Sequence, residues 1–136
     1  MKAAVFKGAK NIVVQDIELR DLQEHEILIK VRACGICGTD VHIYNGDEGA
    51  AKTTPPTILG HEFSGEIVEV GSEVNDLKIG DKVSVDPNQF CGKCDWCQNG
   101  KGYFCESMVG YGTNTNGGFA QYCIVPEQQA LKFENL

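Results

Sequence analysis

The chain has 136 residues, of which 42% are hydrophobic and 23% are charged, and its net charge is −7 at pH 7. This length suits one domain with a modest core, and the acidic balance disfavours a nucleic-acid partner because phosphates would be repelled. No apolar run approaches the roughly 20 residues of a membrane-spanning helix, and residues 1–6 lack the apolar stretch of a signal peptide. We therefore expect a cytoplasmic protein with reduced cysteines and no membrane partner.

Short apolar runs alternate with turn residues along the chain. Strands are expected at 3–6, 12–17, 26–33, 66–70, 82–85 and 121–125. Turns are expected at Gly8, Gly46–Gly49, Pro55-Pro56, Gly80-Asp81 and Gly117-Gly118, and short helical turns at 40–44 and 95–99. Many short strands with irregular loops predict a mainly β fold, a distorted barrel with short helices.

Residues 34–42 (CGICGTDVH) and 60–74 (GHEFSGEIVEVGSEV) carry a candidate catalytic metal site. Cys37 and His61 are zinc-type ligands of mixed softness, a set found where a metal keeps an open position for substrate. Asp40 is expected to accept the other ring N–H of His61 and so to fix the tautomer of that ligand.

Two further side chains in the first motif suggest a proton relay. Thr39 and His42 supply a hydroxyl and an imidazole three residues apart, which share one face if this stretch is helical. Such a pair can pass a proton towards water. Alone, His42 would fit a solvated surface residue equally well, and its proximity to Cys37 favours the relay. Glu62 is either a metal ligand or a structural carboxylate paired with a nearby Arg or Lys.

Residues 91–105 (CGKCDWCQNGKGYFC) place four cysteines at gaps of two, two and seven residues. Four thiolates around one ion are the usual ligands of a closed structural zinc site. The predicted ligands are Cys91, Cys94, Cys97 and Cys105, in a lobe of about residues 88–107. The backbone N–H groups of Gly92 and Lys93 can donate to thiolate sulfur, and the glycines of this stretch permit tight turns.

Disulfides and an iron–sulfur cluster are the alternatives for this cysteine group. The chain has seven cysteines, so a fully paired disulfide framework would leave one over. The bacterial ferredoxin run places its fourth cysteine after three residues and before a proline, whereas here the fourth follows seven residues and precedes Glu106. Structural zinc is therefore favoured. Cys34 and Cys123 are interpreted as buried packing residues, and His25 as a solvated turn residue.

Together, these motifs resemble those of the zinc-dependent medium-chain alcohol and polyol dehydrogenases. The spacing of GHE at 60–62, Gly65, Gly71 and Val74 is similar to the zinc signature of that family. The motif at 34–42 and the cysteine lobe follow the same order. Residues 1–19 and 117–133 resemble the opening hairpin and a later strand pair, so the resemblance covers nearly the whole chain. It implies a GroES-like distorted β-barrel, the catalytic domain, over residues 1–136.

The resemblance also implies a role for each site residue. Cys37 and His61 would bind a catalytic zinc with Glu62 beside it, Thr39 and His42 would form the relay, Asp40 would bond His61, and the lobe cysteines would bind a structural zinc. The implied reaction is NAD(P)-dependent oxidation of an alcohol to a carbonyl, in which zinc lowers the pKa of the bound alcohol so that an alkoxide releases hydride. The implied partner is a small-molecule alcohol or polyol, and the full-length protein would be a homo-oligomer.

One departure from the family concerns the nucleotide-binding Rossmann domain, which follows the catalytic domain in its members, whereas this chain stops at Leu136. The stretch GYGTNTNGG at 110–118 matches only two glycines of G-x-G-x-x-G and is interpreted as a loop. The third catalytic zinc ligand and a returning C-terminal segment would also lie beyond Leu136. We therefore expect a truncated domain that is inactive alone, with NAD or NADP bound in the full-length protein.

A zinc-stabilised GroES-like binding module without redox chemistry is the alternative function. The motifs at 34–42 and 60–62 argue against it, because a pure binding module has no use for a second metal site with a relay. The stretch VDPNQFCGKC at 85–94 resembles the polyol and sugar-alcohol branch of the family more than the enzymes of simple ethanol oxidation.

Overall fold

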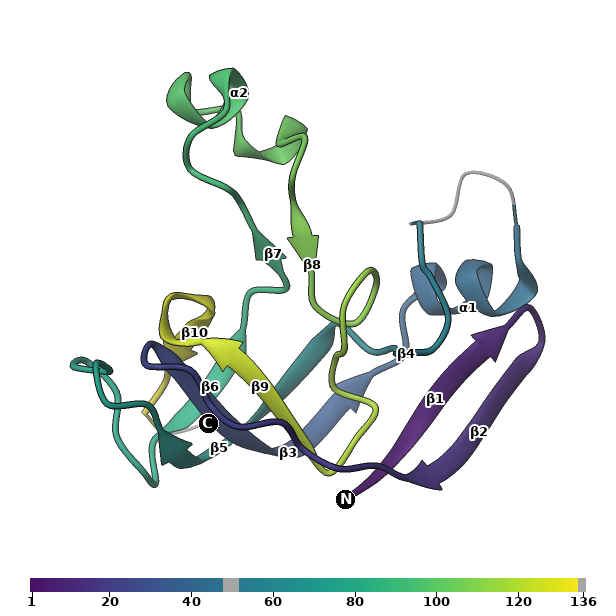
Figure 1. Cartoon of the computed structure of the whole chain (residues 1–136), viewed down its shortest axis with the longest axis horizontal. Helices are drawn as coiled ribbons and strands as arrows, with labels where there is room; N and C mark the ends of the chain where they lie inside the picture. The colour runs from purple at the N-terminus through teal and green to yellow at the C-terminus, as the bar shows by residue number, and fades with distance from the viewer. Residues whose placement is uncertain (48–51, 135–136) are drawn as a thin grey trace.

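The computed structural model describes residues 1–47 and 52–134, and short antiparallel strands dominate its regular structure (Figure 1). The strands are β1 (Lys2–Gly8), β2 (Asn11–Asp16), β3 (Glu26–Gly35), β4 (Thr57–Ile58), β5 (Glu62–Val70), β6 (Lys82–Val85), β7 (Asn88–Gln89), β8 (Val109–Gly110), β9 (Tyr122–Pro126) and β10 (Ala130–Lys132). The helices are α1 (Gly38–Asn45) and α2 (Asp95–Gln98), and the 3-10 turns are η1 (Gly102–Phe104) and η2 (Glu127–Gln129). The predicted mainly β fold with short helices is confirmed. Among the described residues, no helix is long and apolar enough to cross a membrane.

The strands form three sheets. A five-stranded sheet has the order β10-β6-β5-β3-β9, and a three-stranded sheet has the order β2-β1-β4. The third sheet is a two-stranded ribbon of β7 and β8, paired through Asn88 with Gly110 and Gln89 with Val109. Figure 1 shows this ribbon carrying α2 and η1 away from the other sheets, while α1 lies beside the β1–β2 hairpin. The cysteine lobe is therefore a projection on a narrow neck.

The six strands expected from the sequence are all present. The predicted strand at 82–85 has the bounds of β6, and the predicted helical turns lie within α1 and at α2. The strand expected at 66–70 begins earlier, at Glu62, because the Ser and Gly residues of its first half hide the apolar alternation. Strands β4, β7, β8 and β10 were not predicted, since segments of two or three residues are too short to show a period. Gly49, expected in a turn, lies outside the described residues.

The main core lies on the five-stranded sheet. In β5, Phe63 and Ile67 face inward with Gly65 between them, and β3 adds Ile27 and Ile29 from the neighbouring strand. The buried members of this core are Ile27, Ile29, Phe63, Ile67, Val83, Val85, Tyr111, Cys123 and Val125. Burial of this apolar surface is the main source of the free energy of folding, at roughly 25 cal/mol per Å² removed from water.

A smaller cluster fixes the position of α1. Phe6 of β1, Ile43 of α1 and the fully buried Leu59 pack together, with Phe119 against them. Leu59 lies two residues before His61, and Ile43 lies in the helix that begins directly after Cys37. The same apolar contacts therefore hold the two sequence motifs of the candidate catalytic site against each other.

Two candidate metal centres

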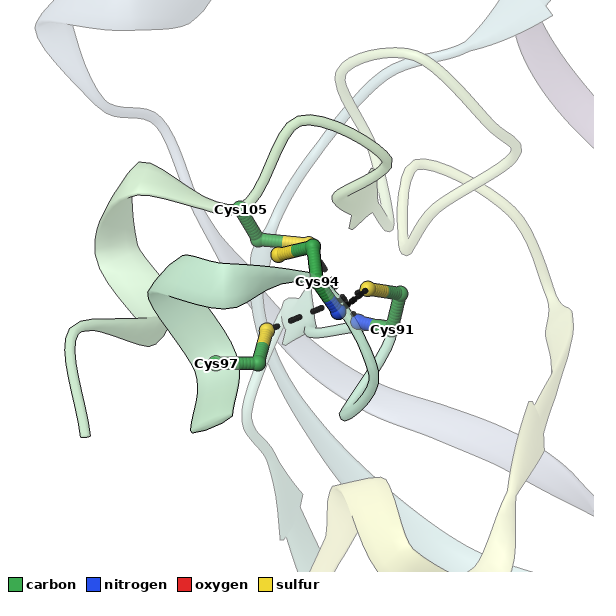
Figure 2. Close-up of side chains that lie close together, drawn as sticks. All are labelled: Cys91, Cys94, Cys97 and Cys105. Atoms are coloured by element: carbon green, nitrogen blue, oxygen red, sulfur yellow. Dashed lines mark hydrogen bonds between the residues drawn. The ribbon is translucent and has the colours of Figure 1, made fainter. Parts of the chain in front are cut away.

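The four lobe cysteines converge at the end of the β7–β8 ribbon, although they come from different local structures. Cys91 follows β7, Cys94 precedes α2, Cys97 lies within α2, and Cys105 directly follows η1. Figure 2 shows their side chains pointing towards one another. All four sulfurs lie within 4.8 Å of one another, and the Sγ atoms of Cys91 and Cys97 are 3.9 Å apart. Sulfurs arranged tetrahedrally at about 2.3 Å from a zinc ion would be about 3.8 Å apart, so the residues fit this ion.

Backbone amides in the lobe donate hydrogen bonds to cysteine sulfurs and so favour their thiolate form. The amide of Cys94 donates to Cys91 Sγ at 3.4 Å, and the amide of Cys91 donates to Cys105 Sγ at 3.3 Å. Hydrogen bonds from the amides of Lys93 and Cys94 lower the pKa of Cys91 to about 6, whereas desolvation raises the pKa of Cys97 to about 12. One thiol thus ionises well before another, and a bound Zn²⁺ would deprotonate the rest.

The second centre joins the start of α1 to the start of β5. Cys37 immediately precedes α1, His61 immediately precedes β5, and Glu62 is the first residue of that strand. One potential ligand atom from each of the three lies within 4.8 Å of the others. Cys37 and His61 are half-buried, while Glu62 is exposed. None of the described lysines or arginines forms an ion pair with Glu62. The described residues therefore contain no cationic partner for Glu62 as a structural carboxylate.

Asp40 connects the two halves of this centre. Its side chain is only 5% exposed, and its Oδ2 accepts a hydrogen bond from the amide of Cys37 at 2.9 Å. Its Oδ1 accepts from the amide of Gly60 at 3.3 Å and lies 3.6 Å from Nδ1 of His61. Asp40 and His61 are thus close together, as expected, but beyond hydrogen-bond distance. The two hydrogen bonds to the amides of Cys37 and Gly60 hold the backbone beside each proposed ligand.

His61 has an unpartnered nitrogen that fits the ligand interpretation. Its Nδ1 is buried and has no hydrogen-bond partner among the described residues. A buried polar nitrogen without a partner costs about 1–3 kcal/mol, which is tolerated where the residue has another task. A small movement of the ring would bring Nδ1–H into hydrogen-bond reach of Asp40 and leave Nε2 for a metal, as zinc-binding histidines are usually arranged.

The two proposed relay residues lie on α1, beside the second centre. The Oγ1 of Thr39 lies 3.7 Å from the Sγ of Cys37, which brings the hydroxyl against a proposed ligand. His42 is one helical turn further on, and its side chain is 63% exposed. This arrangement runs from the half-buried centre to solvent, as the relay hypothesis requires.

Glycines of the stretch at 110–118, expected only as loop residues, hold the backbone of the second centre in place. The stretch at 110–118 contains no helix, in agreement with the loop interpretation. It packs directly on Gly60, whose carbonyl accepts a hydrogen bond from Gly118 at 2.7 Å. A Cβ added at Gly112 or Gly117 would lie 2.1 or 2.2 Å from the oxygen of Gly60. In the sequence, this packing role was indicated by the many glycines at 110–118, which the incomplete G-x-G-x-x-G motif did not explain.

A hollow of about 510 Å³ opens beside the second centre. His61 and Glu62 line it, together with Ser64, Ser84 and Pro87. Ser64 of β5 and Ser84 of β6 are paired across the sheet, so their positions are fixed by the strand register. The hollow therefore contains hydroxyl groups together with two of the proposed metal-site residues.

Cys123 and His25 have the structural roles expected of them, whereas Cys34, which was expected to be buried, is only half-buried. Cys123 is buried in the main core, and burial raises its pKa to about 12. Cys34 packs against the same core, and burial raises its pKa to about 11. Thiols held in this protonated state are poor ligands and poor nucleophiles. His25 is exposed and lies 3.6 Å from a carboxylate oxygen of Glu127.

Sequence and structure comparisons with known proteins identify the family of this domain. The profile of the alcohol dehydrogenase GroES-like domain matches residues 23–135. L-threonine 3-dehydrogenase of Escherichia coli is 43% identical over 134 residues, which are 97% of this chain and 39% of that protein. A structure described as a zinc-binding dehydrogenase of Sinorhizobium meliloti 1021 bound to NADP has a TM-score of 0.92 at 41% identity, covering 98% of this chain and 38% of that chain. Galactitol-1-phosphate dehydrogenase of Escherichia coli has a TM-score of 0.88 at 31% identity, with coverages of 98% and 38%.

The fold and these matches define a GroES-like domain, as the sequence resemblance implied. The chain belongs to the zinc-dependent medium-chain alcohol dehydrogenase family. It spans 39% of the length of the L-threonine 3-dehydrogenases that it matches, so the activity of the whole protein is a matter for proposal.

Proposed function

We propose that this chain is the catalytic-domain portion of a zinc-dependent NAD(P) alcohol or polyol dehydrogenase, which oxidises an alcohol to a carbonyl. The observation that carries this proposal is the convergence of Cys37, His61 and Glu62 from two distant segments. A GroES-like binding module without redox chemistry would need the lobe for stability, but it would not need this second group.

In this function, Cys37 and His61 would hold the catalytic zinc, and Glu62 would lie beside it. When bound, the ion supplies Lewis acidity and the nicotinamide supplies the hydride acceptor. Asp40 would orient both ligands, through the Cys37 amide and through the approach to the His61 ring. The lobe cysteines would hold a second, structural zinc.

Thr39 and His42 would move the proton that the alcohol loses. The hydroxyl of Thr39 lies beside Cys37, and His42 carries an imidazole into solvent one turn later along α1. A hydroxyl followed by an imidazole is a suitable route, because each can accept one proton and release another. The chain therefore contains both the proton acceptor and the exit to water.

The proposed substrate is a small, polar alcohol or polyol. Two relatives are described as dehydrogenases of L-threonine and of galactitol-1-phosphate, both of which carry hydroxyl groups on short polar carbon chains. Ser64 and Ser84 in the hollow beside His61 are suited to hydrogen-bond such hydroxyls. The full-length protein would be a cytoplasmic homo-oligomer that binds NAD or NADP, since two of the related structures contain such a cofactor.

The order in which a chelator removes metal tests this proposal. The zinc-loaded chain should hold about two ions, and dialysis against a mild chelator should remove the one at Cys37 and His61 first. The reason is that four thiolates close the lobe site, whereas the second centre has an exposed carboxylate as its third group. Elemental analysis after each step should therefore show a plateau at about one zinc per chain.

A Glu62→Gln variant shows which of the two ions the chelator removes first. It should weaken zinc binding at the second centre and leave the plateau of the lobe zinc unchanged. Loss of both ions in one step, or earlier loss of the lobe ion, would contradict the assignment of the two centres.

A further inference from the structure

Asp47, the second residue after the end of α1, is held beside His42 by backbone hydrogen bonds. Gly46 adopts a left-handed conformation, with φ 76°, and its amide donates to the carbonyl of Ile43 at 3.1 Å. The amide of Asp47 donates to the carbonyl of His42 at 3.0 Å, which completes a Schellman motif. The last turn of the helix therefore brings Asp47 directly beside the proposed relay imidazole.

The β1–β2 turn supports this helix end from the other side. The amide of Lys10 donates to the carbonyl of Tyr44 at 2.6 Å. A Cβ added at Gly46 would lie 2.9 Å from the Cβ of Ala9, so a glycine is required both by φ and by space. The hairpin turn thus packs on the end of α1 and limits its fraying.

The side chains of the two residues also meet. The Nδ1 of His42 lies 2.8 Å from Oδ2 of Asp47. An ionised carboxylate can only accept a hydrogen bond, so the ring must carry its proton on Nδ1 and leave the lone pair on Nε2. We propose that Asp47 is a positioning residue that holds His42 as the Nδ1–H tautomer, which makes Nε2 the proton-accepting nitrogen of the relay. The catalytic meaning of this assignment rests on the proposed function.

The chain contains a closely matched pair that lacks this bond. The amide of Glu127 donates to the carbonyl of His25 at 3.0 Å, as the amide of Asp47 does to His42. Both imidazole side chains are 63% exposed, but Nδ1 of His25 lies 3.6 Å from the Glu127 carboxylate, beyond hydrogen-bond distance. Exposed ion pairs as such contribute little, so the short contact of His42 is what should select a tautomer.

The proposed consequence is a defined nitrogen, Nε2, at which the proton arrives. A proton that reaches Nε2 converts the neutral ring to an imidazolium with Nδ1 still bonded to Asp47. The adjacent carboxylate balances the new positive charge until water or a buffer base removes one proton and restores the neutral ring. No proton is created or lost in this exchange, and Asp47 itself stays ionised.

Ring-nitrogen NMR of the zinc-loaded 136-residue chain tests the inference. At about pH 8.5, where imidazoles are neutral, His42 should show the Nδ1–H pattern, whereas His25 should show the Nε2–H-rich mixture of a free imidazole. In Asp47→Ala, the Nδ1–H pattern of His42 should be lost and replaced by that of His25. Glu127→Ala is the matched control and should leave the His42 pattern unchanged.

The tautomer result and the proposed function can fail separately. If wild-type His42 gives the same pattern as His25, or if Asp47→Ala leaves the pattern unchanged, the positioning role of Asp47 is overturned. Unchanged amide signals for Asp40 and Ile43 in the variant would show that α1 is intact, so that a changed ring pattern reports the lost contact. Absence of metal at Cys37 and His61 would instead overturn the proposed function and leave the tautomer assignment intact.

Discussion

Replacing Cys94 with serine is expected to unfold the cysteine lobe of the zinc-loaded chain. Structural zinc sites contribute folding free energy directly, on the order of 10 kcal/mol in small zinc domains, and the lobe has no buried apolar residues of its own to replace it. The lobe joins the sheets through the short β7–β8 ribbon, so the barrel core should survive. The predicted result is a local loss of structure with a large loss of zinc affinity.

The single tryptophan of the chain reports this change. Trp96 lies in α2, and its ring centroid is 5.1 Å from that of Phe104 in η1. Its emission should shift towards that of solvent-exposed indole in Cys94→Ser and upon removal of the lobe zinc. The matched variant Cys37→Ser should leave the emission unchanged and alter stability only modestly. A chain that unfolds when Cys37 is replaced, but not when Cys94 is replaced, would reverse the two assignments.

Replacing Gly117 with alanine is expected to destabilise the chain by about 1–3 kcal/mol, the typical range for overpacking. The added Cβ would lie 2.2 Å from the carbonyl oxygen of Gly60 and 2.3 Å from the Cα of Gly112, and neither backbone atom can move away as a flexible side chain could. Because Gly60 precedes His61, the same substitution should also weaken metal binding at the second centre. Chemical denaturation and zinc affinity are the measurements.

Gly38→Ala is the control for this substitution. A Cβ at Gly38 would meet nothing within 4 Å, and the residue lies in the first turn of α1. Alanine favours a helix over glycine by up to about 1 kcal/mol, so this variant should be as stable as the wild type or slightly more so. Equal stability of the Gly38→Ala and Gly117→Ala variants would show that the loop at 110–118 does not press on Gly60 as described.

Strand patterns in the sequence predicted the framework, but not its shortest parts. The run at 82–85 was predicted with its observed bounds, because Val83 and Val85 are buried and alternate with exposed residues. The two-residue strands β7 and β8 pair only because the lobe between them folds back on itself. No local pattern encodes such a contact, since it depends on pairs of residues that are 20 and 22 positions apart.

The candidate ligands were predictable for a different reason. Cysteine and histidine at metal-binding spacings limit the possible chemistry, and the structure brings Cys37, His61 and Glu62 together as a metal site would require. Their assignment as zinc ligands remains a prediction. The sequence could not show that Asp40 bonds the amide of Gly60, because that bond joins α1 to the segment before β5 and depends on how the two pack together. The contact of Asp47 with His42 was missed for a different reason, since it is local and arises from the geometry of the helix end.

A cobalt titration of the metal-free chain tests the two-centre account most directly. Co²⁺ replaces zinc in such sites, and its thiolate charge-transfer absorption grows with the number of coordinating sulfurs. We predict that the first equivalent gives the intense spectrum of four thiolates. A second, weaker equivalent should add the absorption of one thiolate, and Cys37→Ser should abolish that second phase alone. A single binding phase in the wild type, or a second phase that survives in Cys37→Ser, would contradict the proposed catalytic centre.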